Sequence, residues 1–191
     1  MRGIELLRAL QRLNKPFYTI PDLEKVTRLP RNSLYVALNR WVSGGFLEKV
    51  AQGIYIPPGT NVSFEDIASQ LYIPNYLSFE SALSRHGILN LVPYTLTFAT
   101  TRKTRKYTFQ KRVVEFRQIS PELFFGFENR NGYYVALPEK AFLDGIYFMI
   151  RGKTTLDFEE LNIKKLSGTT LRSFSRRFPR YVQKYVDQMS V

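Results

Sequence analysis

The stretch from Ile4 to Pro57 reads IELLRALQRLNKPFYTIPDLEKVTRLPRNSLYVALNRWVSGGFLEKVAQGIYIP. Its apolar residues recur at helical spacing before the Asn14-Lys15-Pro16 break and again before the Leu29-Pro30 turn. These apolar residues are Ile4, Leu7, Leu10, Leu13, Leu23 and Val26. We therefore expect helices at residues 4–13, 21–28 and 31–43, the last of them ended by Gly44-Gly45. Alternating runs at 46–50 and 54–56 then predict a hairpin that turns at Ala51-Gln52-Gly53.

Three helices followed by a hairpin are the pattern of a winged helix-turn-helix, in which the third helix enters the major groove of DNA. Helical periodicity predicts that this helix buries Leu34, Ala37, Leu38 and Trp41, with Val42 at the edge. The opposite face then carries Asn32, Ser33, Val36, Asn39, Arg40 and Ser43, with Tyr35 on its flank. Asparagine and arginine suit adenine and guanine edges, and a bare valine suits a thymine methyl group.

The residues around this helix are expected to hold the DNA backbone. Arg28 and Arg31 lie at the turn, where they are better placed for phosphates than for bases. Lys49 and Gln52 lie on the hairpin and would reach the backbone or the minor groove. Two alternatives stay open at this point: the polar helix face is simply solvated, or the winged helix binds another protein. The net charge of the chain favours DNA.

The chain has 191 residues, a formal charge of +12 and a pI near 10.0, so it favours polyanionic partners. The basic excess is spread over both parts, with nine Lys/Arg against four Asp/Glu in residues 1–59 and nineteen against twelve in 60–191. There is no cysteine, which excludes disulfides and thiolate metal sites. No segment approaches the roughly 20 apolar residues of a membrane span. We expect a cytoplasmic protein with no cofactor and no metal.

Pro57-Pro58-Gly59 predicts a boundary between a domain at 1–59 and a second domain at 60–191. In the second domain Ser63 and Ser78 are expected to cap short helices, the latter closing at Gly87. Strands are predicted at 94–100, 107–110, 113–119, 124–127 and 133–136, with a turn at 129–132. Helices are predicted at 139–150, 158–161, 169–177 and 179–189. The expected class is α+β with a mostly antiparallel sheet.

Four segments of the chain resemble the AbiEi antitoxins of abortive-infection, type IV toxin–antitoxin systems. They read GIYIP at 53–57, YLSFESALSRHG at 76–87, FATTR at 98–102 and ALPEKAFLD at 136–144. The resemblance implies a winged helix that binds inverted repeats in its own promoter and represses the operon. It also implies a second domain that counters a co-expressed, nucleotidyltransferase-like toxin, with or without direct contact. The alternative is a winged-helix regulator whose second domain senses a ligand or dimerises, without a toxin.

Two groups of basic residues in the second domain are candidates for nucleic-acid contact. The hairpin cluster comprises Arg102, Lys103, Arg105, Lys106, Lys111, Arg112 and Arg117. The C-terminal cluster comprises Arg172, Arg176, Arg177, Arg180 and Lys184. The hairpin cluster is open to two interpretations: contact with nucleic acid, either DNA beside the operator or RNA on the toxin, or a solvated turn that protects a sheet edge. The C-terminal cluster either extends the DNA contact or is an ordinary surface.

Catalysis is not expected. The single histidine, His86, lies at a predicted helix end, where it suits the terminal carbonyl groups. Glu139 and Asp144 are five residues apart on a predicted helix, so they point in different directions, and Asp144 is expected to pair with Lys140. No glycine-rich phosphate loop follows a predicted strand. A nucleic-acid-processing enzyme therefore remains the weakest alternative.

Overall fold

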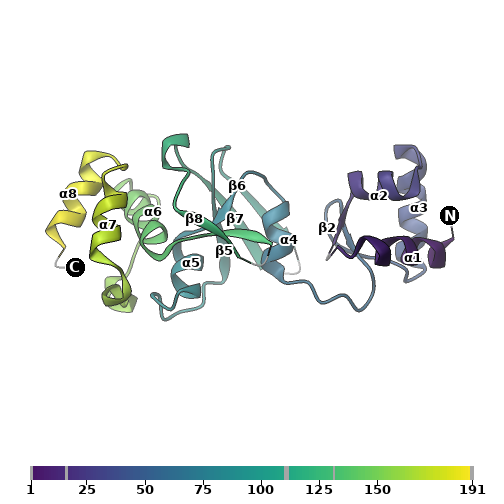
Figure 1. Ribbon diagram of the computed structural model, residues 1–191, viewed down its shortest axis with the longest axis horizontal. Coiled ribbons are helices and arrows are strands. Elements are labelled where there is room, and N and C mark those ends of the chain that lie inside the picture. The colour runs from purple at the N-terminus through teal and green to yellow at the C-terminus, as the bar shows by residue number, and fades with distance from the viewer. Residues whose placement is uncertain (1, 16, 110–111, 131, 190–191) are drawn as a thin grey trace. The chain divides into compact units, whose positions relative to one another are not determined.

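The computed structural model describes residues 2–15, 17–109, 112–130 and 132–189, which divide into two compact units, residues 1–67 and 68–191 (Figure 1). The division falls within helix α4 (Phe64–Gln70). The Ser63 hydroxyl accepts a hydrogen bond from the Asp66 N–H at 3.0 Å, and so caps this helix as expected. None of the helices in the described ranges has both the length and the apolar character needed to cross a bilayer.

The first unit combines three helices with a small three-stranded sheet. Its elements are α1 (Gly3–Leu13), β1 (Tyr18–Thr19), α2 (Ile20–Thr27), α3 (Arg31–Ser43), β2 (Glu48–Ala51) and β3 (Ile54–Ile56). The sheet order is β1-β3-β2, with both pairs antiparallel. The helices and the hairpin lie where the sequence predicts them. Strand β1 was not predicted, because two residues are too few to show an alternating pattern.

The buried face of α1 differs from the apolar face predicted from the sequence. Leu6 and Leu10 are fully buried, whereas Ile4 is 60% exposed and Leu13 is also largely exposed. Leu6 follows Ile4 by two positions, so the two side chains lie on nearly opposite sides of the helix. The Tyr18 hydroxyl donates a hydrogen bond of 2.6 Å to the Leu10 carbonyl, which ties β1 to the buried side of α1.

The second unit is built on a six-stranded mixed sheet in the order β6-β7-β5-β4-β9-β8. The strands are β4 (Tyr76–Leu77), β5 (Thr95–Thr100), β6 (Arg105–Phe109), β7 (Arg112–Gln118), β8 (Phe127–Arg130) and β9 (Tyr133–Ala136). Among the described strands, the pairs β4–β5, β6–β7 and β8–β9 are antiparallel, as expected for most of the sheet, whereas β5–β7 and β4–β9 are parallel, so the sheet is mixed. The parallel pairs join segments distant in sequence, so hairpin signals could not reveal them.

The segment expected as a strand at 124–127 is also corrected. Pro121–Leu123 forms a short 3-10 helix, η1, and β8 begins only at Phe127. Pro121 occupies the first helical position, where its fixed φ and missing N–H are tolerated. The predicted helix at 158–161 is likewise a single 3-10 turn, η2 (Phe158–Glu160), and a further turn, η3 (Ile163–Lys165), follows.

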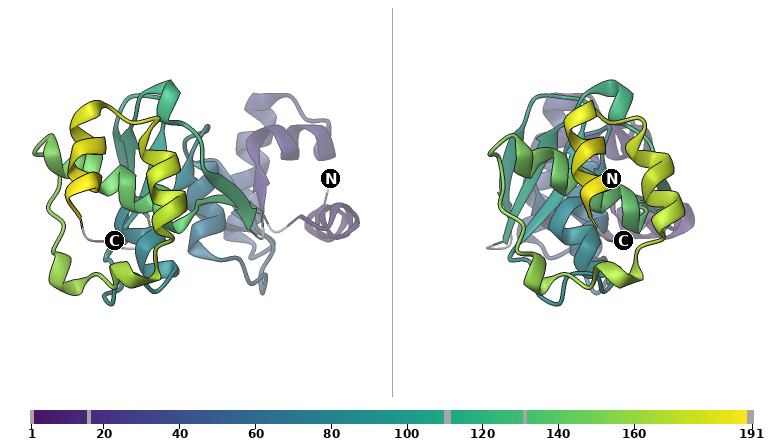
Figure 2. Two further views of the ribbon diagram at one scale, coloured as in Figure 1. Left: turned by 60° about the vertical axis from the view of Figure 1, so that its left-hand side comes forward. Right: turned by 90° about the vertical axis from the view of Figure 1, so that its left-hand side faces the viewer.

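Four α-helices complete the second unit: α5 (Phe79–Arg85), α6 (Pro138–Ile150), α7 (Gly168–Ser175) and α8 (Arg180–Gln188). Helix α5 packs against β5 and α6, and α6 in turn contacts α7 and α8 (Figures 1 and 2). Residues 139–148 of α6 are all buried, so this helix is the central support between the sheet and the C-terminal helices.

Candidate nucleic-acid interface

Helix α3 presents its polar face because its apolar stripe is fixed in the core. Leu34, Ala37, Leu38 and Trp41 are all at most 5% exposed. The helix begins after Pro30, whose carbonyl accepts a hydrogen bond of 2.9 Å from the Leu34 N–H. Its last turn is closed by the Phe46 N–H, which donates to the Trp41 carbonyl at 2.8 Å. The rotation of α3 about its own axis is therefore set by burial and by both ends.

The exposed face of α3 contains every residue expected to read bases. Asn32, Ser33, Val36, Asn39, Arg40 and Ser43 are all exposed. Val36 is 72% exposed, an unfavourable position for a β-branched apolar side chain on a helix with a well-filled core behind it. Positions 32, 36, 39 and 43 follow one another at helical spacing, so their side chains form a single stripe along the helix.

The α2–α3 turn positions two cations beside this stripe. Arg28 ends α2 with φ 55°, in the left-handed region, and its N–H donates to the Glu24 carbonyl at 2.9 Å. Arg31 lies at the first position of α3, with its Nε atom 3.8 Å from a Glu24 carboxylate oxygen. A hydrogen bond with Tyr35, together with the nearby Glu24, raises the pKa of Arg31 above its ordinary value. Arg31 thus remains a cation under all ordinary conditions.

Tyr35, on the flank of α3, lies near the hairpin. The Tyr35 side chain is 44% exposed. The pKa of Tyr55 in β3 is raised, first by burial and second by the nearby Tyr35. In the hairpin Tyr55 lies opposite Lys49 of β2, and both Lys49 and Gln52 are exposed. Tyr35 therefore lies near the hairpin that carries Lys49, a proximity that helical periodicity alone does not reveal.

Three of the interface cations are available for an external anion. Among the described residues, Arg28, Arg40 and Lys49 form no ion pair with an acidic side chain, whereas Arg31 is close to Glu24. Uncompensated cations around a polar stripe of asparagine, serine and arginine are the chemistry of a surface that binds phosphates and base edges.

The hairpin cluster of the second unit is only partly a free basic surface. The Arg102 guanidinium lies 4.2 Å from the centre of the Tyr72 ring and donates to the Ile73 carbonyl at 3.2 Å. Arg105 lies over the Tyr107 ring, and Lys106 pairs with Glu115 at 3.3 Å. Lys103 is exposed and Arg112 is half-buried, while Lys111 lies outside the described residues.

Arg117 was expected in the exposed hairpin cluster, but it does not belong to that surface. Its guanidinium is largely buried and pairs with Glu80 at 2.8 Å and with Glu115 at 3.0 Å. Glu80 also accepts a hydrogen bond from the Thr154 hydroxyl at 2.9 Å. Arg117 is therefore an internal tie between α5, β7 and the segment after α6, and its charge is neutralised within the fold.

The C-terminal cluster is more exposed. Arg172, Arg176, Arg180 and Lys184 lie on the surface of α7 and α8 and the turn between them. Arg177 is also exposed, but its guanidinium stacks on Phe125 at 3.7 Å from the ring centre and donates to the Glu122 carbonyl at 3.4 Å. Most of this cluster thus lies at the solvent-exposed surface, and Arg177 also fastens η1 to the C-terminal helices.

A buried polar cluster joins β4 to α6. The Tyr76 and Ser78 hydroxyls donate to one Asp144 oxygen at 2.9 and 2.8 Å, and Lys140 pairs with the other. The Lys140–Asp144 pair was predicted, but its complete burial was not, and Ser78 bonds Asp144 instead of capping α5. Burial lowers the pKa of Lys140 against the opposing effect of Asp144, and burial and Asp144 raise the pKa of Tyr76 well above its ordinary value.

His86 has a structural contact. It follows α5 as the C-cap residue, and its Nε2 atom forms a hydrogen bond of 2.8 Å with the Ala136 carbonyl of β9. Glu139 accepts a hydrogen bond of 2.8 Å from the Ser167 N–H and so holds the start of α7. Among the described residues, no group of three or more His, Cys, Asp or Glu side chains is placed to hold a metal ion.

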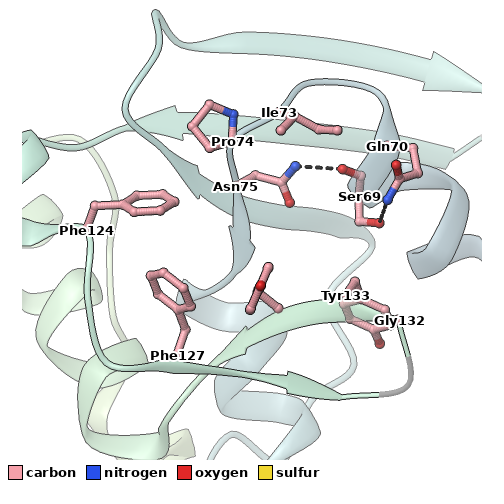
Figure 3. Close-up of a pocket in the computed structure, with 10 residues that line it drawn as sticks. Ser69, Gln70, Ile73, Pro74, Asn75, Phe124, Phe127, Gly132 and Tyr133 are labelled. Atoms are coloured by element: carbon pink, nitrogen blue, oxygen red, sulfur yellow. Dashed lines mark hydrogen bonds between the residues drawn. The ribbon is translucent and has the colours of Figure 1, made fainter.

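A pocket in the second unit was not predicted from the sequence. It has a volume of about 320 Å³ and lies between the turn after α4 and the β8–β9 hairpin (Figure 3). It is lined by Ser69, Gln70, Ile73, Pro74, Asn75, Phe124, Phe127, Gly132, Tyr133 and Tyr134. These residues come from three separate segments, so no local pattern marks them.

The chain matches no protein-family profile, and comparison with curated proteins finds no relative.

Proposed function

We propose that the first unit is a winged helix-turn-helix that binds double-stranded DNA, with α3 in the major groove and the β2–β3 hairpin as the wing. The observation that carries this proposal is the exposed stripe of Asn32, Val36 and Asn39 on a helix whose rotation is fixed by its buried side. Asn39 and Arg40 would read base edges, and Val36 would meet a thymine methyl group. Arg28, Arg31 and Lys49 would hold phosphates on either side.

We further propose that the chain acts in the cytoplasm as an AbiEi-type antitoxin and autorepressor, without catalysis of its own. Support comes from the four segments that resemble this family and from the basic surface of α7 and α8. Its DNA partner would be inverted repeats in its own promoter. Its protein counterpart would be a nucleotidyltransferase-like toxin. Co-expression with the product of a neighbouring gene of that class should restore growth that the neighbour alone arrests.

A second candidate function is a winged-helix regulator whose second unit senses a small ligand. The pocket between α4 and the β8–β9 hairpin favours it, because ligand sites are concave and mostly apolar with a few polar groups. Growth arrest by a neighbouring gene product, relieved by this chain, supports the antitoxin. A promoter affinity that changes with a small molecule, without such a toxin, supports the sensor.

The DNA-binding proposal is tested by footprinting and gel shift on the DNA upstream of the gene, using the full chain. We expect protected inverted repeats. Asn39→Ala should cost roughly 1–3 kcal/mol on the preferred site and leave binding to random DNA unchanged. Asn61→Ala, which removes another exposed asparagine of the first unit outside α3, is the matched control.

Two results would count against this assignment. Equal weakening of operator and random DNA by Asn39→Ala would make Asn39 a positioning residue. No protection at a salt concentration that preserves specific complexes would mean that α3 serves a protein contact instead.

A further inference from the structure

The orientation of Asn75 makes the pocket chemically specific. Its side-chain NH2 group donates to two carbonyl oxygens, of Ser69 at 2.7 Å and of Tyr72 at 3.1 Å, so the amide cannot be turned around. The Oδ1 atom therefore faces the pocket (Figure 3). Asn75 is only 8% exposed, and no described residue donates to this oxygen. The Asn75 oxygen is thus a fixed acceptor in the pocket that has no donor within the described part of the chain.

The walls around this acceptor are aromatic and uncharged. Phe124 and Phe127 lie on one side, and Tyr134 of β9 also lines the pocket. The rings of Phe127 and Tyr134 are 5.3 Å apart in an edge-on arrangement, and Tyr134 is 48% exposed. None of the ten lining residues is charged. The buried part of a ligand would therefore be a neutral planar ring with a donor on its edge, and about 320 Å³ suits one small ring system.

Positive charge begins at the rim of the pocket. Ile73 lines the pocket, and its carbonyl accepts the hydrogen bond from Arg102, which stacks on Tyr72. Lys103 follows and is exposed. A ring with a donor edge inside and an anionic group outside is the chemistry of a nucleotide. Aromatic stacking with a basic groove is also how proteins hold the bases of single strands.

We propose that this pocket binds a single nucleobase through its exocyclic amino group, with the attached phosphate toward Arg102 and Lys103. The amino group of adenine or cytosine donates to the Asn75 oxygen, and the ring stacks against Phe124, Phe127 and Tyr134. The base comes either from a free nucleotide or from a single-stranded nucleic acid. This site is independent of the operator contact made by α3.

The test measures binding of the full chain to AMP, CMP and UMP by calorimetry, and to labelled A6, C6 and U6 RNA by fluorescence anisotropy. We expect AMP or CMP, or the matching hexamer, to bind at least about fivefold more tightly than the uracil form. Purine riboside monophosphate, which lacks the amino group of AMP, should bind as weakly as UMP. Asn75 itself is not substituted, because its amide hydrogens hold the turn after α4.

Tyr134→Ala removes one stacking wall at a half-exposed position and should weaken binding of the amino bases about fivefold or more. Tyr94→Ala, at an exposed tyrosine that does not line the pocket, is the matched control and should have no effect. Ile73→Glu adds a negative charge at the rim and should weaken AMP more than adenosine. Thermal unfolding of each variant checks that the fold is kept.

Binding of mononucleotides identifies a free nucleotide as the ligand, and binding of hexamers alone identifies a strand. The proposal is overturned if no probe binds at millimolar concentration. It is equally overturned if binding occurs but Tyr134→Ala, correctly folded, leaves it unchanged. Loss of operator binding in the α3 variants, with nucleobase binding kept, would separate this site from the proposed winged helix.

Discussion

Arg28 occupies the left-handed backbone region at φ 55°, where a non-glycine residue costs on the order of 1 kcal/mol. Glycine adopts this conformation without that cost. Arg28→Gly should therefore raise the free energy of unfolding by about 1 kcal/mol and at the same time weaken DNA binding. If Arg28 neutralises one phosphate, the slope of log affinity against log salt should fall by about one. Denaturant unfolding and gel shifts at several salt concentrations measure the two effects.

Asn14→Gly provides the control for this prediction. Asn14 also lies in the left-handed region, at φ 46°, but asparagine tolerates it better and the side chain carries no charge. This variant should change stability less than Arg28→Gly and leave the salt slope unaltered. A more stable Arg28→Gly protein with an unchanged salt slope would show that Arg28 does not contact a phosphate.

Asp22 should make the stability of the first unit depend on pH. Burial acts to raise its pKa, but hydrogen bonds from Lys15 at 2.6 Å and from the Thr19 N–H and hydroxyl outweigh it, so the pKa is lowered. The group is therefore more acidic folded than unfolded. Its contribution to stability is present above about pH 4, the unfolded value, and is lost as the pH falls through the lowered folded pKa.

Thermal unfolding of wild type and Asp22→Asn, measured between about pH 2 and pH 6, tests this dependence. We expect the wild type to be more stable at pH 6 and the difference to shrink below about pH 4. A difference that stays constant over the whole range would mean that the carboxylate charge has no part in capping α2.

At the residue scale, helical periodicity predicts the exposed face of α3 but not that of α1, and the sequence predicts long-range contacts poorly. The exposed stripe of α3 follows from helical periodicity, because the rule needs only neighbouring residues. The Ser78–Asp144 hydrogen bond joins residues 66 positions apart. Ser78 precedes a helix in the manner of a capping residue, so a local rule gives the wrong partner for its hydroxyl. The acceptor in the pocket was missed because Asn75 is oriented by two backbone carbonyls.

At the element scale, α6 and β4 are joined by the buried Lys140–Asp144 pair. Lys140→Met would leave Asp144 as an uncompensated buried charge and should cost about 3–5 kcal/mol of stability. In the double variant Lys140→Met with Asp144→Asn, the neutral amide oxygen still accepts from Tyr76 and Ser78. This double variant should be more stable than Lys140→Met alone, as measured by urea unfolding.

A double variant no more stable than Lys140→Met would point to packing instead of charge. The ammonium group of Lys140 lies about 5 Å from the ring centres of Phe125 and Phe178, at 5.0 and 4.8 Å. Methionine would fill this space with a different shape, and the loss of stability would then come from those ring contacts.

The elements themselves were largely predictable, and their pairing was not. Helix α3 spans Arg31–Ser43 as expected, because Pro30 and Gly44 mark its ends. The parallel pairs of the sheet have no short-range signal, since the strands that they join are not neighbours in the sequence. At 124–127 three phenylalanines suggested a strand, but Phe124 packs on Tyr76 and Phe127 from the segment that leads into β8.

For the whole molecule, the distribution of charge should govern how the proposed DNA binding responds to salt. Replacing Arg176, Arg180 and Lys184 with glutamine removes three exposed cations of the C-terminal cluster. If they meet operator DNA, the salt slope should fall by up to about 0.9 for each phosphate that is no longer neutralised. The same replacements at Arg151, Lys153 and Lys164, which are exposed outside both clusters, remove equal charge and should change the slope less. Equal changes in the salt slope for the two triple variants would mean that the cluster acts only through the overall charge of the protein.

The order of strands in the six-stranded sheet determines when the second unit can fold during translation. Strand β4 lies between β5 and β9, and its partner across the parallel pair is Val135. The sheet therefore cannot close until the chain has been translated through β9, at about 5–20 residues per second. The first unit needs only residues 1–67. The first unit, with α3, can thus fold seconds before the second unit has been translated. Binding of the proposed promoter site by α3 would therefore precede any activity of the second unit.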